Sequence, residues 1–396
     1  MTAATVSANR VRLVGILAGA LAVHVAVLAL LPGQHFPDSA SYRTAGEQFR
    51  RLVLMDNPNI MPLYPLLLAI VGGGWGQKLA DLALSLATVW LVYAIALRIY
   101  RDEAVALVAA LFCALWPHFA FFAAVGLTET LFIALVLAAL LCLYDARYAL
   151  ASLFFVLGIL TRPALELLAP LLIFYAALVI HRETARAAFT RLLAYIVIYV
   201  ALMAPWWVYN YHRYGQFVRL DLAGGIVLYT GNNPVNTSGG GVGKGQDVNL
   251  SVLPSITDPI ARDAALKQEA IRYIKADPGH FIAMMPVKFL RLWRPWPYTG
   301  DYQNPLIVAA SVASAVPAFM LALVGLALTL RTNFIRLAPC LAYVGYLTFV
   351  HVVTFGSVRY RVPLEPIVLI LAAAGLVEIL RRIEPGRRLL APLSAS

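Results

Sequence analysis

The stretch Phe36-Pro-Asp-Ser-Ala-Ser-Tyr42 marks the point where the sequence changes from membrane-like to surface-like. It follows an apolar run that ends near Leu31, and it contains Asp38, the first acidic residue. In the next segment, Ser39 to Leu54, apolar residues share one helical face, which predicts an amphipathic helix lying along a membrane surface. Asp38 either caps this helix or has a chemical task beside the membrane.

The overall composition is that of an integral membrane protein. The chain is 61% hydrophobic and 13% charged, with a mean hydropathy of +0.77, whereas soluble domains average about 25% charged residues. Long continuous apolar runs exclude a barrel and predict an all-α polytopic bundle. The net charge of +11 is no sign of nucleic acid in such a protein, and we expect no nucleic-acid partner. The three cysteines lie in apolar runs and are interpreted as packing residues.

Hydropathy predicts a bundle of about ten transmembrane helices, the first of them an uncleaved N-terminal span. The break between the fifth and sixth spans is placed at Thr161-Arg162-Pro163. The expected spans lie near residues 12–31, 77–98, 104–122, 127–144, 148–161, 163–180, 192–210, 306–330, 336–355 and 361–380.

The distribution of arginine predicts the orientation of this bundle. Every short turn assigned to the cytoplasm carries at least one Arg, and so do both tails, which therefore are expected to be cytoplasmic. Two long polar loops, 32–77 and 211–304, then lie on the outer side. The expected organisation is an N-terminal membrane module (1–210), a large outer loop with short helices (211–304) and a C-terminal membrane module (305–396).

Within the two loops, three segments stand out. Met61 to Gly74 is apolar but too short to cross, so it is expected to pack on the bundle or to enter the outer interface. The Gly/Asn-rich stretch from Gly231 to Gly245 fails the Walker pattern and is interpreted as a mobile loop. A helix is predicted from Asp258 to Lys275, before Asp277-Pro278.

Ionisable residues near span ends gather on the predicted outer side. Such residues are costly at membrane depth and are usually functional or paired. Each one alone has a structural explanation, as a helix-terminal acid or an interfacial anchor, but their convergence predicts one outer cavity. The lone histidines His24 and His351 are interpreted as packing residues. The converging residues are Asp38, His118, Glu129, Arg162, Arg359, Arg361 and Glu365.

Sugar transfer from a lipid phosphate requires this kind of residue set. The acceptor hydroxyl loses a proton as it attacks the anomeric carbon, which calls for a positioned carboxylate as general base. Negative charge grows on the leaving phosphate, which arginines or a metal stabilise. The donor's tail stays in lipid, so the site must open at the membrane surface. Asp38 on an interfacial helix, with arginines at span ends, meets these requirements.

The order and spacing of several motifs resemble a known family, the bacterial membrane glycosyltransferases with the GT-C fold. The branch is the one near the protein O-mannosyltransferases and the lipid A aminoarabinose transferases, known as glycosyltransferase family 39. The motifs are Pro37-Asp38 with Tyr42, Pro62-Leu-Tyr-Pro-Leu66, Leu127-Thr-Glu-Thr-Leu-Phe132, Leu160-Thr-Arg-Pro163, Pro205-Trp206 with Asn210 and Gly215, Gly231-Asn-Asn-Pro234, Asp277-Pro278 through Lys288 and Trp293, and Arg359-Tyr-Arg-Val-Pro363.

The resemblance implies a polyprenyl-phosphate sugar donor, transfer at the outer face of a bacterial inner membrane, and Asp38 as the catalytic base. Many relatives carry a second acid beside the first-loop Asp, where this chain has Ser39, so Glu129 is the expected second catalytic acid. No cofactor is certain, and a divalent metal stays open. We expect the donor phosphate at Arg162, Lys288, Arg359 and Arg361, and a substrate pocket lined by Tyr42, Tyr64, His118, Asn232 and Tyr360.

The acceptor is left open among lipid, glycan and protein, with membrane lipids as further partners. Two other functions remain. A lipid or glycan transporter or flippase would show midplane charges and internal repeats, of which the sequence shows little. A glycan polymerase or ligase using a lipid-diphosphate oligosaccharide differs from the first reading in donor size.

Overall fold

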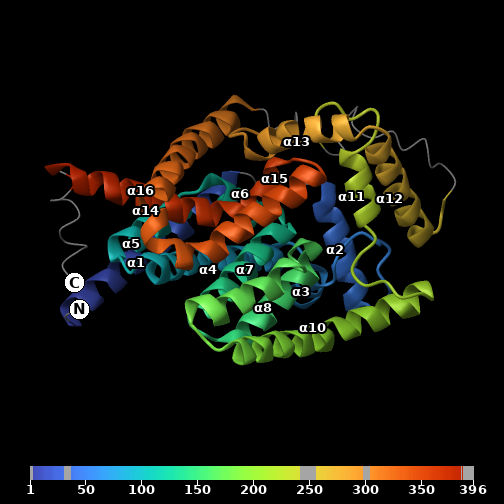
Figure 1. Cartoon of the computed structure of the whole chain (residues 1–396), viewed down its shortest axis with the longest axis horizontal. Coiled ribbons are helices and arrows are strands. Elements are labelled where there is room, and N and C mark those ends of the chain that lie inside the picture. The colour runs from blue at the N-terminus through green and yellow to red at the C-terminus, as the bar shows by residue number, and fades with distance from the viewer. Residues whose placement is uncertain (1–2, 31–36, 241–255, 298–303, 385, 387–396) are drawn as a thin grey trace.

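The computed structural model describes residues 3–30, 37–240, 256–297, 304–384 and 386, and the regular elements in these residues are helices (Figure 1). The helices are α1 (Ala3–Leu30), α2 (Pro37–Arg50), α3 (Leu63–Val71), α4 (Trp75–Tyr100), α5 (Glu103–Ala114), α6 (Pro117–Val125), α7 (Thr128–Tyr144), α8 (Tyr148–Thr161), η1 (Pro163–Leu165), α9 (Leu168–Tyr175), η2 (Ala176–Ile180), α10 (Ala185–Tyr214), α11 (Gly224–Gly231), α12 (Pro259–Ala276), α13 (Pro278–Trp293), α14 (Pro305–Val353), α15 (Val358–Arg361), η5 (Val362–Leu364) and α16 (Glu365–Arg382).

Several helices are apolar and long enough to cross a membrane, so the chain is an all-helical, multi-pass membrane protein. In the described residues five helices meet this condition: 8–30 of α1, α4, α10, α14, and α15 to α16 taken together. The pair α5 and α6, bent by 48°, would add a sixth. Three other apolar segments, α7, α8 and α9 with η2, are shorter. The expected count of ten spans is therefore not confirmed and stays a prediction.

The sequence predicted a turn between two spans at residues 331–336. This prediction is wrong, because α14 continues through these residues as one helix of 49 residues. The helix nevertheless turns back. Ser311 and Tyr343 would lie about 48 Å apart in a straight helix. Yet His118 bonds both Ser311 and Glu365, and the Tyr343 hydroxyl donates to Pro363 O at 3.1 Å. Both halves of α14 thus run beside α16, as Figure 1 also shows.

Helix α16 lies at the centre of the bundle. All of its residues from Glu365 to Gly375 are buried, and it packs on α4, α5 and α14. Its contact with α14 is close because both helices carry glycine there. A Cβ on Gly325 would lie 2.0 Å from Leu371 O, and one on Gly375 would lie 2.2 Å from Leu321 O. Small residues at such crossings let membrane helices approach closely. By contrast, α1 and α10 leave most of their apolar surface outside the bundle.

The helix boundaries follow local chemistry. The Asp258 side chain accepts from Ala261 N at 2.7 Å and starts α12, and Asp277 caps α13 in the same way. Gly126 ends α6 at φ 71°, where a Cβ would collide with the Gln77 amide. The predicted break at Thr161-Arg162-Pro163 is confirmed, because α8 ends there and Arg162 is extended.

The two predicted loop segments are helical and pack on each other. Helix α2 begins at Pro37 rather than at Ser39, so that Asp38 lies in its first turn, and it ends at Arg50 rather than near Leu54. Helix α3 lies against α2, where a Cβ on Gly46 would be 2.8 Å from Leu68 Cβ. The Gly/Asn-rich stretch is described only as far as residue 240, so the prediction of mobility for 241–245 lies outside the described residues.

The elements of the predicted outer loops gather at one end of the molecule. Figure 1 shows α2, α11 and α12 at one end, whereas α1 begins and α16 ends at the other. Helices α2, α11 and α12, which are far apart in the sequence, therefore lie at the same end of the molecule.

Candidate functional site

Four charged side chains from four distant segments meet beside α2. The Arg359 guanidinium joins two carboxylates: its Nη1 donates to Asp38 Oδ2, and its Nε donates to Glu129 Oε1 at 2.5 Å. Arg162 Nη2 lies 3.3 Å from the same oxygen of Glu129. Two carboxylates and two guanidinium groups thus balance in formal charge. Paired in this way, charges tolerate a poorly hydrated environment that none could occupy alone.

The two carboxylates differ sharply in accessibility. The Glu129 side chain is fully buried at the start of α7, whereas that of Asp38 is 54% exposed at the start of α2. Burial between two arginines leaves Glu129 no access to a substrate hydroxyl and suits it to orienting the guanidinium groups. Asp38 is the carboxylate that an arriving hydroxyl can reach.

Ser39, the residue next to Asp38, holds the start of α2 in place. Its hydroxyl is buried and donates to Val125 O, at the end of α6, at 2.7 Å. The side chain in the position where relatives were expected to carry a second acid therefore makes an anchoring contact. One such hydrogen bond contributes about 1 kcal/mol net.

Three tyrosines surround the four charges. Tyr42 packs edge-on against Tyr64, with ring centroids 5.6 Å apart, and Tyr360 lies under Arg162 at 5.3 Å. Burial raises the pKa of both Tyr42 and Tyr64, so both hydroxyls stay protonated and can donate. The Tyr64 hydroxyl donates to Asp81 at 2.9 Å.

Lys288 is packed against the loop that leads into α15. Its side chain is buried, and Nζ donates to Asn232 Oδ1 at 2.8 Å and to Val353 O at 3.5 Å. No carboxylate pairs with it in the part of the chain that the structure describes. The contact is tight, since a Cβ on Gly356 would lie 2.2 Å from Lys288 O. Burial lowers the pKa of Lys288 to about 8.

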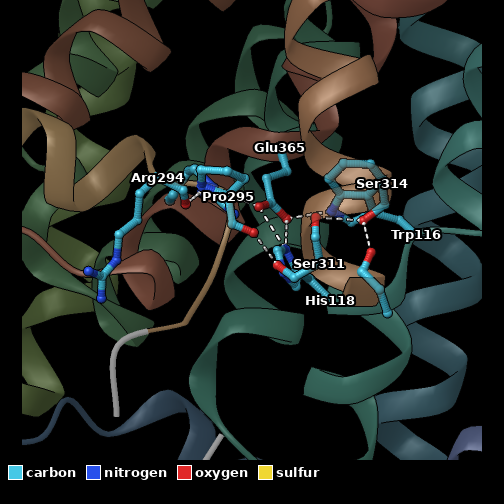
Figure 2. Close-up of polar contacts among 9 residues, drawn as sticks. Trp116, His118, Arg294, Pro295, Ser311, Ser314 and Glu365 are labelled. Atoms are coloured by element: carbon cyan, nitrogen blue, oxygen red, sulfur yellow. Dashed lines mark hydrogen bonds and ion pairs between the residues drawn. The ribbon is translucent and has the colours of Figure 1, made fainter. Parts of the chain in front are cut away.

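A second, separate cluster is built around Glu365 (Figure 2). Its carboxylate accepts from Trp116 Nε1 at 2.6 Å, from His118 Nδ1 at 2.8 Å and from Arg361 Nε at 2.8 Å. His118 Nε2 lies 3.1 Å from Ser311 Oγ, whose hydroxyl donates to Pro295 O. His118 thereby connects the Glu365 carboxylate to Ser311 and, through the Ser311 hydroxyl, to Pro295 O.

This second cluster connects four parts of the fold. Arg361 and Glu365 are fully buried, and Arg361 Nη1 donates to Arg294 O at the end of α13. Contacts to residues 294 and 295 tie the exit of the large loop to α6, α14 and α16. Because the cluster is buried and its charged groups bond one another, we interpret it as a structural joint, meaning a set of contacts that hold these helices together.

The structure therefore separates the predicted site residues into three groups. Six of them surround the Arg359 contact, with Tyr64 behind Tyr42: Asp38, Tyr42, Glu129, Arg162, Arg359 and Tyr360. Lys288 and Asn232 contact each other, and His118 and Arg361 belong to the Glu365 cluster. The roles assigned to these residues stay predictions.

Sequence reasoning did not single out Asp81 and gave His351 only a packing role. Asp81 is fully buried within α4, and His351 stacks on Tyr360 at 4.3 Å. An acidic residue inside an apolar run indicates a functional or paired side chain, because burial of an unpaired charge is costly. The sequence around Asp81 has this feature, so Asp81 could have been identified as a candidate from the sequence.

The residues around Asp38 do not fit a divalent metal in this arrangement. In the described ranges no group of three or more His, Cys, Asp or Glu side chains could hold a metal ion. A guanidinium already lies between Asp38 and Glu129, where a cation would bind.

Comparison with solved structures shows the fold. No protein-family model and no curated protein matches the sequence. The archaeal oligosaccharyltransferase AglB of Archaeoglobus fulgidus, in complex with an inhibitory peptide and a dolichol-phosphate, matches with a TM-score of 0.57 and 12% identity over 97% of this chain. The oligosaccharyltransferase of the same organism in complex with Zn and sulfate matches with a TM-score of 0.58 and 12% identity over 96% of the chain.

This chain spans about half the length of those proteins, 52% and 51% of their chains. ArnT from Cupriavidus metallidurans, bound to undecaprenyl phosphate, gives a TM-score of 0.46 at 14% identity, over 96% of this chain and 62% of that one. The likeness to the two oligosaccharyltransferase structures confirms the expected GT-C fold.

Proposed function

We propose that the protein is a membrane glycosyltransferase that moves a sugar from a polyprenyl-phosphate donor to an acceptor hydroxyl. The observation that carries this proposal is the contact of Arg359 with Asp38 and Glu129, beside the exposed start of α2. This contact places an accessible carboxylate next to two guanidinium groups at the same position in the helical bundle. The fold supports the same class, since an oligosaccharyltransferase of this fold was solved with a dolichol-phosphate.

In the proposed reaction the acceptor oxygen attacks the anomeric carbon while its proton passes to Asp38. The bond between that carbon and the phosphate oxygen breaks, and its electron pair stays on the lipid phosphate. Asp38 needs no large rearrangement to act, because its side chain is already half exposed. Glu129 is a positioning residue in this scheme, since it holds Arg162 and Arg359 together.

The cation that is left for the donor phosphate is Lys288. The charges of Arg162 and Arg359 are balanced by Asp38 and Glu129, whereas Lys288 has no carboxylate partner among the described residues. Lys288 is buried in this structure, so in this proposal the arriving phosphate takes the place of its contacts with Asn232 and Val353 O and shares the donors of Arg359. Arg361 is assigned to the Glu365 joint rather than to the phosphate.

The location follows from the same proposal. We place the Asp38 end of the bundle on the outer side of a bacterial inner membrane and both termini in the cytoplasm, as the arginine distribution predicts. The large loop, with α11 to α13, borders this end and is the proposed determinant of acceptor choice.

The deciding experiment offers two labelled donors to the purified protein in lipid nanodiscs. One is a polyprenyl-phosphate monosaccharide, and the other is a polyprenyl-diphosphate oligosaccharide, which the similarity to oligosaccharyltransferases makes the second candidate. We expect sugar release from the first donor, and none with Asp38→Asn. Release from the second donor alone would replace the monosaccharide transferase by an oligosaccharide ligase, and movement of both lipids without cleavage would support a flippase.

A further inference from the structure

A basic cavity lies at the opposite end of α7 from the Glu129 contact. Its volume is about 420 Å³, within the range of small-ligand sites. Glu129 and Asp145 are 16 residues apart on and after α7, which places the cavity about 24 Å from the first site. The cavity is lined by the ends of α4 and α7, by η2 and its following residue, and by the middle of α14.

The charge of this cavity is strongly positive. Arg98, Arg101 and Arg336 line it, together with His181, and Asp145 is the acid among its lining residues. Arg98 pairs with Asp145, its Nε at 2.6 Å from Oδ1. Arg336 uses Nη1 to bond Arg98 O at 2.5 Å. Two arginine charges therefore remain without a carboxylate in the lining.

Arg101 is the clearest unsatisfied group. It ends α4 in a left-handed conformation at φ 54°, and its side chain is exposed at the cavity. Its guanidinium makes no hydrogen bond or ion pair within the described ranges. The nearby acid Asp102 accepts from Arg381 and so does not neutralise Arg101. A cavity with a free guanidinium and two partly used ones is suited to an anion that accepts several hydrogen bonds.

We propose that this cavity binds a phosphate group, supplied by the headgroup of an anionic membrane lipid or by free phosphate. The cavity opens where apolar helices end, at the height at which a lipid headgroup lies beside a membrane protein. Tyr144 and His181 line the same space, but the Tyr144 hydroxyl donates to Arg336 O and His181 Nε2 bonds Leu143 O, so the arginines are the groups that would bind the phosphate. Arginine pairs with phosphate through parallel hydrogen bonds, which a chloride ion cannot accept, and the cationic part of a zwitterionic headgroup would be repelled by the other arginines of the lining.

The matched test compares Arg101→Gln with Arg186→Gln. Both remove one positive charge, and Arg186 is an exposed residue in the first turn of α10 that does not line the cavity. Delipidated full-length protein is titrated with nanodisc lipid containing phosphatidylglycerol in phosphatidylcholine, and bound lipid is counted by native mass spectrometry. A second series replaces the lipid by inorganic phosphate and follows the melting temperature.

We expect Arg101→Gln to weaken phosphatidylglycerol binding about tenfold, the loss typical of one charge-assisted hydrogen bond, while Arg186→Gln stays near wild type. Stabilisation by inorganic phosphate that Arg101→Gln abolishes, without lipid selectivity, would equally support the site and identify free phosphate as the source. Equal binding by wild type and Arg101→Gln in both series, or equal losses for both variants, would overturn the proposal. Unchanged melting of both variants without ligand shows that they are folded.

Discussion

Arg359 and Arg361 are two residues apart, yet they enter different ionic clusters. Successive helical residues are about 100° apart, so residues i and i+2 face nearly opposite directions. Arg359 bonds Asp38 and Glu129 at the surface of the bundle, and Arg361 bonds Glu365 in its interior. The short helix α15 thus divides one arginine pair between a candidate reaction site and a structural joint.

The difference between the clusters is accessibility, not charge. In the Arg361 cluster both charged partners are fully buried and enclosed by Trp116 and His118. In the Arg359 cluster one carboxylate, Asp38, is 54% exposed. A carboxylate that takes a proton from a substrate must be accessible to that substrate. A carboxylate that only connects helices can be fully buried. Substitutions should therefore affect turnover at the first cluster and stability at the second.

The largest effect is expected for Asp38→Asn, which should lower turnover by about 10²–10⁴-fold, the usual contribution of a general base. Donor affinity and melting temperature should hardly change, because the side chain is largely exposed. Sugar-transfer rates and donor titration in nanodiscs measure both quantities. A fully active Asp38→Asn protein would remove Asp38 from the mechanism.

Glu365→Gln should have the opposite profile, a loss of about 3–5 kcal/mol of stability, because the buried Arg361 guanidinium loses its anion. Denaturant unfolding in detergent measures the loss. The control is Glu269→Gln, which breaks the exposed pair with Arg272 on α12 and should change stability little. If Glu365→Gln unfolded like wild type but lost turnover, the joint would belong to the reaction site.

Arg359→Lys keeps the charge but cannot bond two carboxylates with a rigid planar group. We expect transfer efficiency, kcat/KM, to fall by roughly ten to a hundredfold, about the value of one charged hydrogen bond. Arg43→Lys on the same helix as Asp38 is the matched control, since Arg43 makes no ion pair among the described residues. An undiminished kcat/KM for Arg359→Lys would contradict the bridging role.

The smallest effect concerns pH. Because burial lowers the pKa of Lys288 to about 8, its charge is lost as pH rises through that value. Donor affinity should then fall by up to about tenfold per pH unit above 8. A phosphodiester donor keeps its own charge over this range, so the change would come from the protein.

The stability of the fold should change in the opposite direction over the same interval. The unfolded lysine, with a pKa of 10.5, binds more protons than the folded one between pH 8 and 10.5, so stability rises there. Lys288→Arg stays charged and should flatten the affinity profile. An unchanged profile in Lys288→Arg would assign the pH dependence to another group.

Much of the fold was predictable because membrane helices are marked by local sequence. Apolar runs, the caps Asp258 and Asp277, and Pro163 define helix boundaries through interactions within a few residues. The course of α14 was not predictable in this way. Its residues 331–336 are polar enough to suggest a loop, yet they continue the helix where Arg336 and Tyr144 bond across to neighbouring segments.

The sequence by itself indicated a helical membrane protein whose motifs resemble those of the GT-C fold, and it placed Asp38 at the start of a helix. It also determined the candidate set of charges, because charges are rare in apolar runs and each one therefore stands out. Only the tertiary structure decided which of these charges meet. Asp38, Glu129, Arg162 and Arg359 come from four segments up to 321 residues apart, and their pairing depends on how α2, α7 and α15 pack. No local pattern records that packing, because it arises from helix contacts between distant parts of the chain.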